Sequence, residues 1–180
     1  MNQFAERLSL NTYKIYAPSG ETQSEIQLQR GIFAASGAPL TPMLKDLKLT
    51  DAPCVTVQGA AYHFFKVLRS DHFFANRFDL GLQELSSSTS PAITAQFGGR
   101  GKINVITYLD QEYTLVPRSW FGFGFELYRG TEIVARFKDV SPFLSFSSRR
   151  RYLIDYPTQP QPPLLVAFTF LLAVNCTYRL

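Results

Sequence analysis

Three adjacent arginines, Arg149, Arg150 and Arg151, form the only run of basic residues in this 180-residue chain. Guanidinium groups hold phosphate through charge-assisted hydrogen bonds, so the run can bind a lipid head group or a nucleic-acid phosphate. Arg136 and Lys138 would join it if the strands that carry them pair with each other. Lipid sites of this kind usually hold about 4–8 basic residues, and the alternative interpretation is a solvated row of arginines at the start of a strand.

A second basic segment, Gly98-Gly99-Arg100-Gly101-Lys102, has the glycines and the lysine of a phosphate-binding loop. That motif requires a glycine where this chain has Gln96, and Ser or Thr after the lysine, where this chain has Ile103. The segment is therefore predicted to be a hairpin turn.

Residues that could hold a metal ion or form a catalytic triad are few. His63 and His72 are the only histidines, and Cys54 lies nine residues before His63. No carboxylate pair completes a metal-ligand spacing, and no motif for an activated nucleophile is present. We therefore expect a non-enzymatic protein with no metal ion and no cofactor.

Composition places the chain among globular, β-rich proteins. It is 46% apolar and 18% charged, which excludes a disordered chain, and the 14% of aromatic residues favours strands. A net charge of +4 is too small to indicate nucleic-acid binding, and two cysteines exclude a disulfide scaffold. The first residues lack the apolar core of a secretory signal, so we expect one cytoplasmic domain over residues 1–180.

Alternating apolar and polar residues predict short strands along most of the chain. The clearest pair is a hairpin of residues 121–128 and 131–140, where Phe125 and Leu127 share one face and Glu126 lies on the other. In the second strand of this hairpin, the predicted outer face carries Glu132, Val134, Arg136 and Lys138. Further strands are predicted at residues 12–16, 25–33, 55–57, 62–67, 92–97, 102–109, 112–116 and 151–156, with one more within 73–85.

An uncharged apolar run covers residues 164–174 and follows a proline-rich stretch at 157–163. A helix that is apolar on every side belongs inside protein or inside lipid. Eleven residues form a helix of roughly 17 Å, whereas a membrane-spanning helix needs about 20 residues to cross about 30 Å. The length favours a buried helix at about residues 163–176, and a tail anchor and a central strand are the alternatives.

A flat sheet covers only one side of such a helix, whereas a closed barrel covers all of it and leaves no exposed strand edges. An eight-stranded barrel is nearly filled by its own side chains, so about twelve strands are needed to admit a helix. We therefore predict a mostly β, α+β fold, with an about twelve-stranded closed antiparallel barrel around a buried hydrophobic C-terminal helix.

This order of elements resembles the tubby C-terminal-like superfamily, which includes the LURP-one-related proteins and the phospholipid scramblases. The resemblance is carried by the hairpin at residues 120–140, the Arg149-Arg150-Arg151-Tyr152-Leu153-Ile154-Asp155 strand and the run at 164–174. It implies a roughly twelve-stranded barrel threaded by a hydrophobic C-terminal helix. It also implies binding rather than catalysis, because tubby domains bind phosphoinositides and scramblase-like members act at membranes.

We therefore expect a monomeric, non-enzymatic barrel that binds an anionic phospholipid head group or a protein partner at a membrane surface, and not nucleic acid. The predicted anion-binding residues are Arg149, Arg150, Arg151, Arg136 and Lys138. The alternatives are a tail-anchored membrane protein with a cytosolic β-domain and a β-barrel that binds a small ligand.

Overall fold

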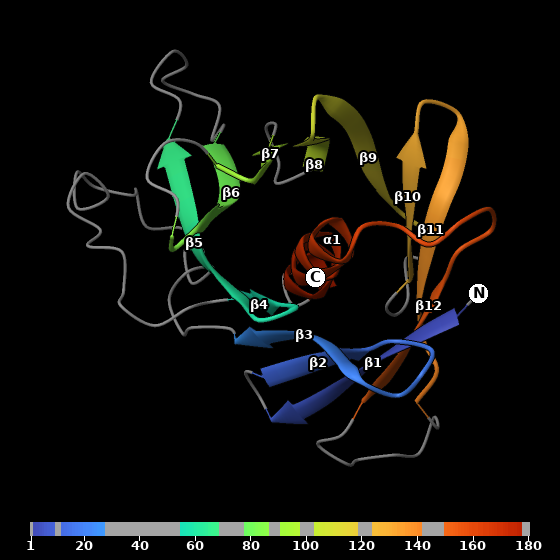
Figure 1. The fold of residues 1–180 in the computed structure, drawn as a ribbon. Coiled ribbons are helices and arrows are strands. Elements are labelled where there is room, and N and C mark those ends of the chain that lie inside the picture. Colours follow the sequence, from blue (N-terminus) through green and yellow to red (C-terminus); the bar gives the residue numbers. More distant parts are fainter. Residues whose placement is uncertain are drawn as a thin grey trace.

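Twelve antiparallel strands close into a barrel around a single C-terminal helix in the computed structural model of this chain (Figure 1). The structure describes residues 2–9, 12–27, 55–68, 78–86, 91–97, 103–118, 124–141 and 150–177. This arrangement confirms the predicted fold class, including the number of strands and the position of the helix.

The elements are short and follow one another in the order predicted by the alternation pattern. Their bounds are β1 (Asn2–Ser9), β2 (Thr12–Tyr16), β3 (Thr22–Gln27), β4 (Val55–Val57), β5 (Ala60–Leu68), β6 (Phe78–Glu84), β7 (Ile93–Phe97), β8 (Ile103–Tyr108), β9 (Gln111–Pro117), β10 (Gly124–Arg129), β11 (Glu132–Asp139), β12 (Arg151–Asp155) and α1 (Pro163–Thr177).

Pairing between β1 and β12 closes the barrel, and every other strand pairs with its neighbours in the sequence. Asn2 lies opposite Asp155 and Glu6 lies opposite Arg151 in this junction. The sequence analysis did not predict β1, because the residues that β1 turns inward include Gln3 and Ala5 rather than large apolar side chains. Closure pairs the backbone of all twelve strands, so no edge is left open to another chain.

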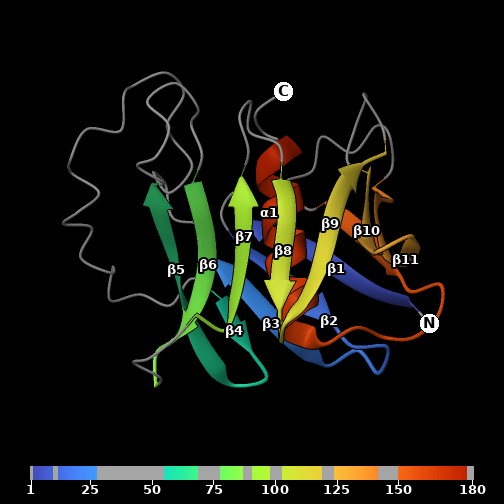
Figure 2. The same cartoon turned by 90° about the horizontal axis from the view of Figure 1, so that it is seen from above.

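Helix α1 begins at one end of the barrel and finishes at the other, and Figure 2 shows it running between the walls. We call these the start end and the finish end. Since the strands alternate in direction, the tight turns β2–β3, β4–β5, β8–β9 and β10–β11 all lie at the start end. Strands β10 and β12 begin at the finish end.

The apolar run forms the buried helix rather than a projecting anchor or a central strand. From Leu164 to Val174, every side chain of α1 is buried in the core cluster. Pro163 occupies the first position of the helix, where its missing N–H leaves no hydrogen bond unmade. Within the described ranges, the structure contains no helix with the length and apolar character needed to cross a membrane.

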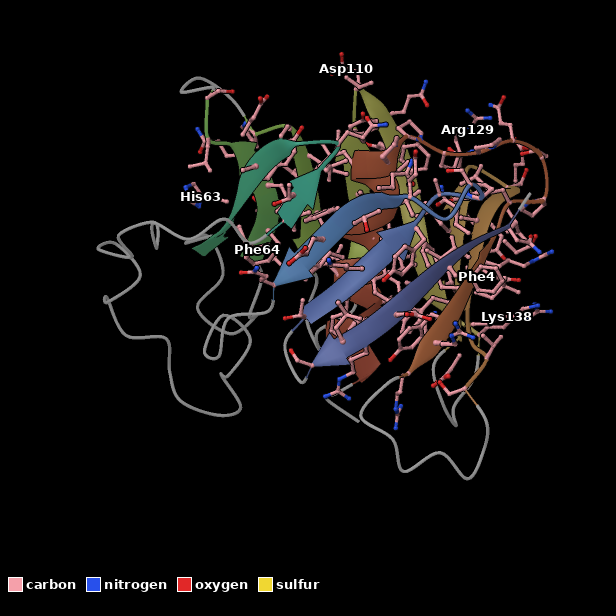
Figure 3. The ribbon with its side chains drawn as sticks, turned by 60° about the horizontal axis from the view of Figure 1, so that its bottom comes forward. Phe4, His63, Phe64, Asp110, Arg129 and Lys138 are labelled. Atoms are coloured by element: carbon pink, nitrogen blue, oxygen red, sulfur yellow. The ribbon has the colours of Figure 1, made fainter. Side chains whose placement is uncertain are left out.

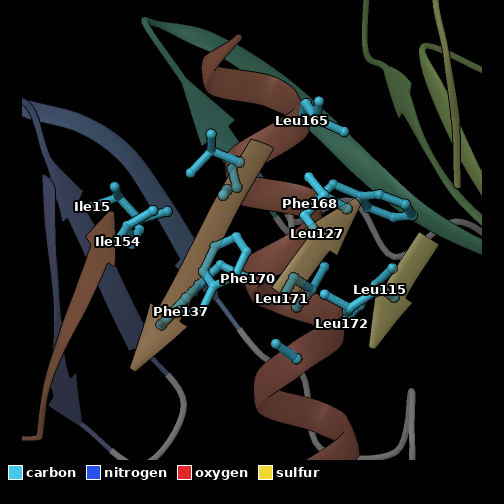
Figure 4. Close-up of a cluster of buried hydrophobic side chains, with 14 of the residues drawn as sticks. Ile15, Leu115, Leu127, Phe137, Ile154, Leu165, Phe168, Phe170, Leu171 and Leu172 are labelled. Carbon is cyan, nitrogen blue, oxygen red and sulfur yellow. The ribbon is translucent and has the colours of Figure 1, made fainter. Parts of the chain in front are cut away.

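Aromatic rings fill the space between α1 and one part of the wall (Figure 4). The ring of Phe170 meets Tyr152 edge-on at 5.3 Å between ring centroids and Tyr13 edge-on at 5.7 Å. Phe137 lies 6.4 Å from the same ring. Strands β2, β11 and β12 therefore contact the helix through large side chains, whereas β3 and β4 approach it closely with their backbones.

Local predictions differ from the structure at a bulge and at strand ends, and residues 28–33 and 121–123 of the predicted strands lie outside the described residues. Val134 was predicted on the outer face, but it is buried, because β11 carries one extra residue between the pairs Leu127–Ala135 and Tyr128–Ile133. Strand β3 begins at Thr22 rather than at residue 25. A bulge shifts the inside–outside alternation by one residue, so a strict period of two cannot place Val134.

Candidate functional site

Three neighbouring strands, β11, β12 and β1, present a mixed cationic and apolar outer surface. Their inward side chains, such as Phe137, Tyr152 and Ala5, lie in the core, so the alternate residues must point outward. We call this surface the β12 face and define it by Asn2, Phe4, Glu6, Leu8, Arg136, Lys138, Val140, Arg151, Leu153 and Asp155.

The register of the three strands arranges these residues in rows across the β12 face. Lys138 lies opposite Leu153, and Leu153 lies opposite Phe4. In the next row toward the finish end, the backbone N–H of Val140 donates to the carbonyl of Arg151, which lies opposite Glu6. The cations and the exposed apolar residues therefore alternate across the same patch of sheet.

The two arginines of the β12 face are both held by carboxylates. Arg151 Nε lies 2.6 Å from Glu6 Oε1. Arg136 Nε lies 3.2 Å from Glu126 Oε1, and Arg136 Nη1 lies 3.7 Å from Asp155 Oδ2. These pairs reduce the net positive charge that either arginine presents to solvent.

Lys138 is the cation of the β12 face without an ion pair to any described residue. Its side chain is exposed and stands between Gly124 on β10 and Leu153 on β12, neither of which is charged. Its ammonium group is consequently the most available positive charge of the patch.

Arg150 and Arg151, the two described arginines of the predicted basic run, pair with different carboxylates. Arg150 Nη1 lies 3.6 Å from Asp139 Oδ2, and Asp139 lies opposite the inward-facing Tyr152. This pair is therefore at the rim of the finish end rather than on the β12 face. The pairing of β11 with β12 places Lys138 opposite Leu153, two residues from Arg151, but it places Arg136 opposite Asp155, four residues from Arg151. Arg149 lies outside the described residues.

Glu126 is the centre of a second polar cluster, on the outer side of β10. Its carboxylate accepts hydrogen bonds from the hydroxyl of Tyr128 at 2.8 Å and from Arg136, and Arg118 Nη1 lies 3.1 Å away. Burial by itself would raise the pKa of Glu126, but the bonds from Tyr128 and Arg136 and the charge of Arg118 outweigh it and lower the pKa. The carboxylate of Glu126 is therefore ionised. Its residue is only 8% exposed, so this charge is largely shielded from solvent.

Large apolar side chains are exposed on the β12 face. Phe4 is 49% exposed, Val140 is 45% exposed and Leu8 is 39% exposed. Figure 3 shows Phe4 and Lys138 on the same side of the barrel, as their register positions require. Scattered single apolar residues are common on protein surfaces, but here Phe4 and Leu8 on β1 and Val140 after β11 lie on the same face as the cations of β11 and β12.

Charge is unevenly divided between the two ends of the barrel in the described residues. Near the start end lie the carboxylates of Glu21, Glu84, Asp110, Glu112 and Glu132, with Arg129 paired to Glu132. Near the finish end lie Arg7, Arg118, Lys138, Arg150 and Arg151, together with the carboxylates of Glu6, Asp79, Glu126 and Asp139, so the finish end is close to neutral and the start end is negative. This division complements the dipole of α1, whose positive end is at the start end.

The remaining candidates from the sequence offer no site within the described part of the chain. His63 lies half-buried on β5, and no group of three His, Cys, Asp or Glu side chains there could hold a metal ion. Cys54, His72 and residues 98–102 lie outside the described residues. Helix α1 occupies the interior of the barrel, and its side chains from Leu164 to Val174 are buried there.

Sequence reasoning missed the contributions of β1, namely Glu6, Phe4 and Leu8. The alternation of Phe4 and Glu6 with Gln3 and Ala5 was the only local signal for them. No protein-family model matches the chain, and no curated protein or solved structure is significantly similar to it.

Proposed function

We propose that this chain is a non-enzymatic barrel whose β12 face contacts an anionic membrane surface. The observation that carries the proposal is the exposure of Phe4 and Leu8 on β1 and of Val140 directly after β11, next to Lys138 on β11 and Arg151 on β12. Apolar side chains enter the boundary between head groups and acyl chains, while cations are attracted by anionic lipid. A surface with both therefore suits the boundary between water and bilayer.

The magnitudes support a weak and reversible contact. Each lysine or arginine near an anionic bilayer contributes about 1 kcal/mol, and full burial of a side chain such as phenylalanine contributes about 1.5–3 kcal/mol. Lys138 and Phe4 lie one strand apart on opposite sides of Leu153, so both can approach the same surface. The electrostatic part of the affinity falls as salt concentration rises.

The uneven charge of the barrel supports one orientation on the membrane. The start end carries an excess of carboxylates, whereas the finish end carries cations and carboxylates in nearly equal number, so an anionic surface repels the start end more than the finish end. Arg150 is one of the cations at the rim of the finish end, although Asp139 partly compensates its charge.

We also propose that the chain is a divergent, cytoplasmic and monomeric member of the tubby C-terminal-like superfamily. The closed twelve-stranded barrel and the hydrophobic C-terminal helix inside it support this kinship. The argument is one of fold, and fold alone does not determine function. The membrane proposal therefore depends on the β12 face and not on the kinship.

Co-sedimentation with phosphatidylcholine vesicles, with and without phosphatidylserine, tests the proposed function. We expect the chain to bind only when phosphatidylserine is present, and less at high salt. Phe4→Ser is expected to lower the partition constant about tenfold. Lys138→Gln combined with Arg151→Gln is expected to lower it about thirtyfold.

Matched controls come from the start end. Leu109 is an exposed leucine and Arg129 is an exposed arginine paired to a glutamate, so Leu109→Ser and Arg129→Gln make the same chemical changes far from the β12 face. Both variants are expected to bind like the wild type. Equal binding by Phe4→Ser and the wild type would exclude the β12 face, and an acidic protein partner would then be the better proposal for its cations.

A further inference from the structure

Glu6 lies between two cations at the centre of the barrel closure. Its register partners are Arg151 on β12 and Lys14 on β2. Lys14 Nζ lies 3.4 Å from Glu25 Oε2, so Lys14 has a carboxylate of its own on β3. Arg151, in contrast, has Glu6 as its ion-pair partner among the described residues, at 2.6 Å.

Glu6 accepts its hydrogen bond from Nε of Arg151 and not from the end of the guanidinium fork. The two Nη groups of an arginine carry four further N–H donors. The side chain of Arg151 is 68% exposed, so these groups are within reach of an anion from solvent. The carboxylate of Glu6 thus leaves the Nη donors of Arg151 accessible, but it cancels most of the positive charge of Arg151.

An exposed ion pair of this kind contributes only about 0–1 kcal/mol to stability. A pair that weak does not hold its arginine against a dense layer of anions. Near a weakly charged surface, however, Glu6 opposes the attraction of Arg151, because a carboxylate close to an anionic bilayer is itself repelled. An anionic surface therefore binds only when its attraction for the cations of the β12 face exceeds its repulsion of Glu6.

We infer that Glu6 is a specificity-determining residue that sets how anionic a surface must be before the β12 face binds it. The inference rests on the proposed function and extends it. With Glu6 ionised, Lys138 supplies the uncompensated charge of the patch, and Arg151 contributes only when lipid phosphates or carboxylates compete with Glu6 for its donors.

Glu6→Gln tests the inference, because glutamine keeps an oxygen acceptor for Arg151 Nε and removes the negative charge. We expect about fivefold stronger partitioning onto phosphatidylcholine–phosphatidylserine vesicles, the effect of about one charge near the bilayer. Half-maximal binding is expected at a lower fraction of phosphatidylserine than for the wild type. Thermal unfolding of the variant should stay close to that of the wild type.

The matched control is Glu132→Gln, which removes the same charge from an exposed glutamate paired to Arg129 at the start end. It is expected to leave vesicle binding unchanged. A second variant places Glu6→Gln in an Arg151→Gln background, where a gain of about fivefold is again expected, because the Glu6 carboxylate is repelled by the bilayer whether or not Arg151 is charged.

The outcomes separate the inference from the proposed function. If the wild type binds anionic vesicles but Glu6→Gln binds no better than Glu132→Gln, the inference is wrong and the proposed function stands. Weaker binding by Glu6→Gln would also overturn it and would make Glu6 a positioning residue for Arg151. If neither the wild type nor Glu6→Gln binds anionic vesicles, both the inference and the proposed function are wrong.

Discussion

The hydroxyl of Tyr156 donates a hydrogen bond to Oε1 of Gln3, with 2.5 Å between the two oxygens. Tyr156 directly follows β12 and Gln3 is on β1, so this bond reinforces the junction that closes the barrel. Nε2 of Gln3 donates in turn to Oε1 of Gln23 on β3 at 2.7 Å. The segment that leads into α1 is thereby attached to the inner side of the first and third strands.

Tyr156→Phe is expected to lower the free energy of unfolding by about 1–3 kcal/mol, because it leaves the buried acceptor of Gln3 without its donor. Urea unfolding followed by circular dichroism measures the change. Tyr16→Phe is the control, since Tyr16 is half-buried on the outer side of β2, and it should change stability by less than about 0.5 kcal/mol. Equal stability of Tyr156→Phe and the wild type would mean that the bond contributes nothing.

Alkaline pH should destabilise the barrel through the same tyrosine. Burial raises the pKa of Tyr156 in the folded state, so the folded chain holds this proton more tightly than the unfolded chain does. The resulting stability is complete below the ordinary tyrosine pKa of about 10 and is lost as pH rises through the higher folded value. The free energy of unfolding should therefore fall less steeply above about pH 10 in Tyr156→Phe than in the wild type.

Phe168→Asp is expected to abolish the cooperative unfolding of the whole barrel. Phe168 is fully buried on α1, and an unpaired charge at such a position costs several kcal/mol, a large part of the usual total of about 5–15 kcal/mol. Phe4→Asp, on the β12 face, should leave the unfolding transition in place. A folded barrel in Phe168→Asp would show that α1 is not an essential part of the core.

Glu126→Gln should destabilise the barrel at neutral pH by about 1.5–3 kcal/mol, because it removes the negative charge that Arg118 and Arg136 both pair with. The pKa of Glu126 is lowered in the folded state, so its contribution is present above the ordinary pKa and is lost as pH falls through the folded value. The free energy of unfolding, measured with urea, should then depend less on pH below about 4.3 in the variant than in the wild type. Glu132→Gln removes one partner of the exposed ion pair with Arg129, so it should lower the free energy of unfolding by only about 0–1 kcal/mol.

The turn between β8 and β9 can be stabilised. Leu109 and Asp110 both have positive φ, 47° and 58°, in a two-residue turn that favours Asn-Gly. Leu109→Asn combined with Asp110→Gly should raise stability by about 1 kcal/mol and the thermal midpoint by about 2–4 °C. Gly130→Ala should act in the opposite direction, because Gly130 has a φ of 60° in the turn after β10. An unchanged midpoint would indicate that the turn carries no strain.

The elements that the sequence predicts well are those with a strong and uninterrupted period. Tyr152, Ile154 and Tyr156 alternate without exception, and all three are buried as expected. The apolar run gives α1 almost residue for residue. Strand β1 was missed because Gln3 faces inward, where it is satisfied by Tyr156 and Gln23 rather than by apolar neighbours.

The candidate site was only partly accessible to sequence reasoning. The pairing of neighbouring strands β11 and β12 could be anticipated, and it places Lys138 two residues from Arg151, with Arg136 farther away opposite Asp155. The partner of Arg151 could not be anticipated, because Glu6 lies 145 residues away in the sequence and meets it only where the barrel closes. Long-range pairing of that kind leaves no trace in local periodicity.

The position of α1 after all twelve strands has a consequence for biosynthesis. The side chains that fill the barrel leave the ribosome after the strands that they must cover, and β12, the pairing partner of β1, leaves only shortly before them. Inward-facing residues such as Leu80, Leu82 and Ile106 therefore stay without cover throughout elongation, when nascent chains are most prone to aggregate. We therefore expect the barrel to be filled only after the helix has been translated, because a polypeptide halted before Pro163 lacks the side chains that occupy the barrel interior.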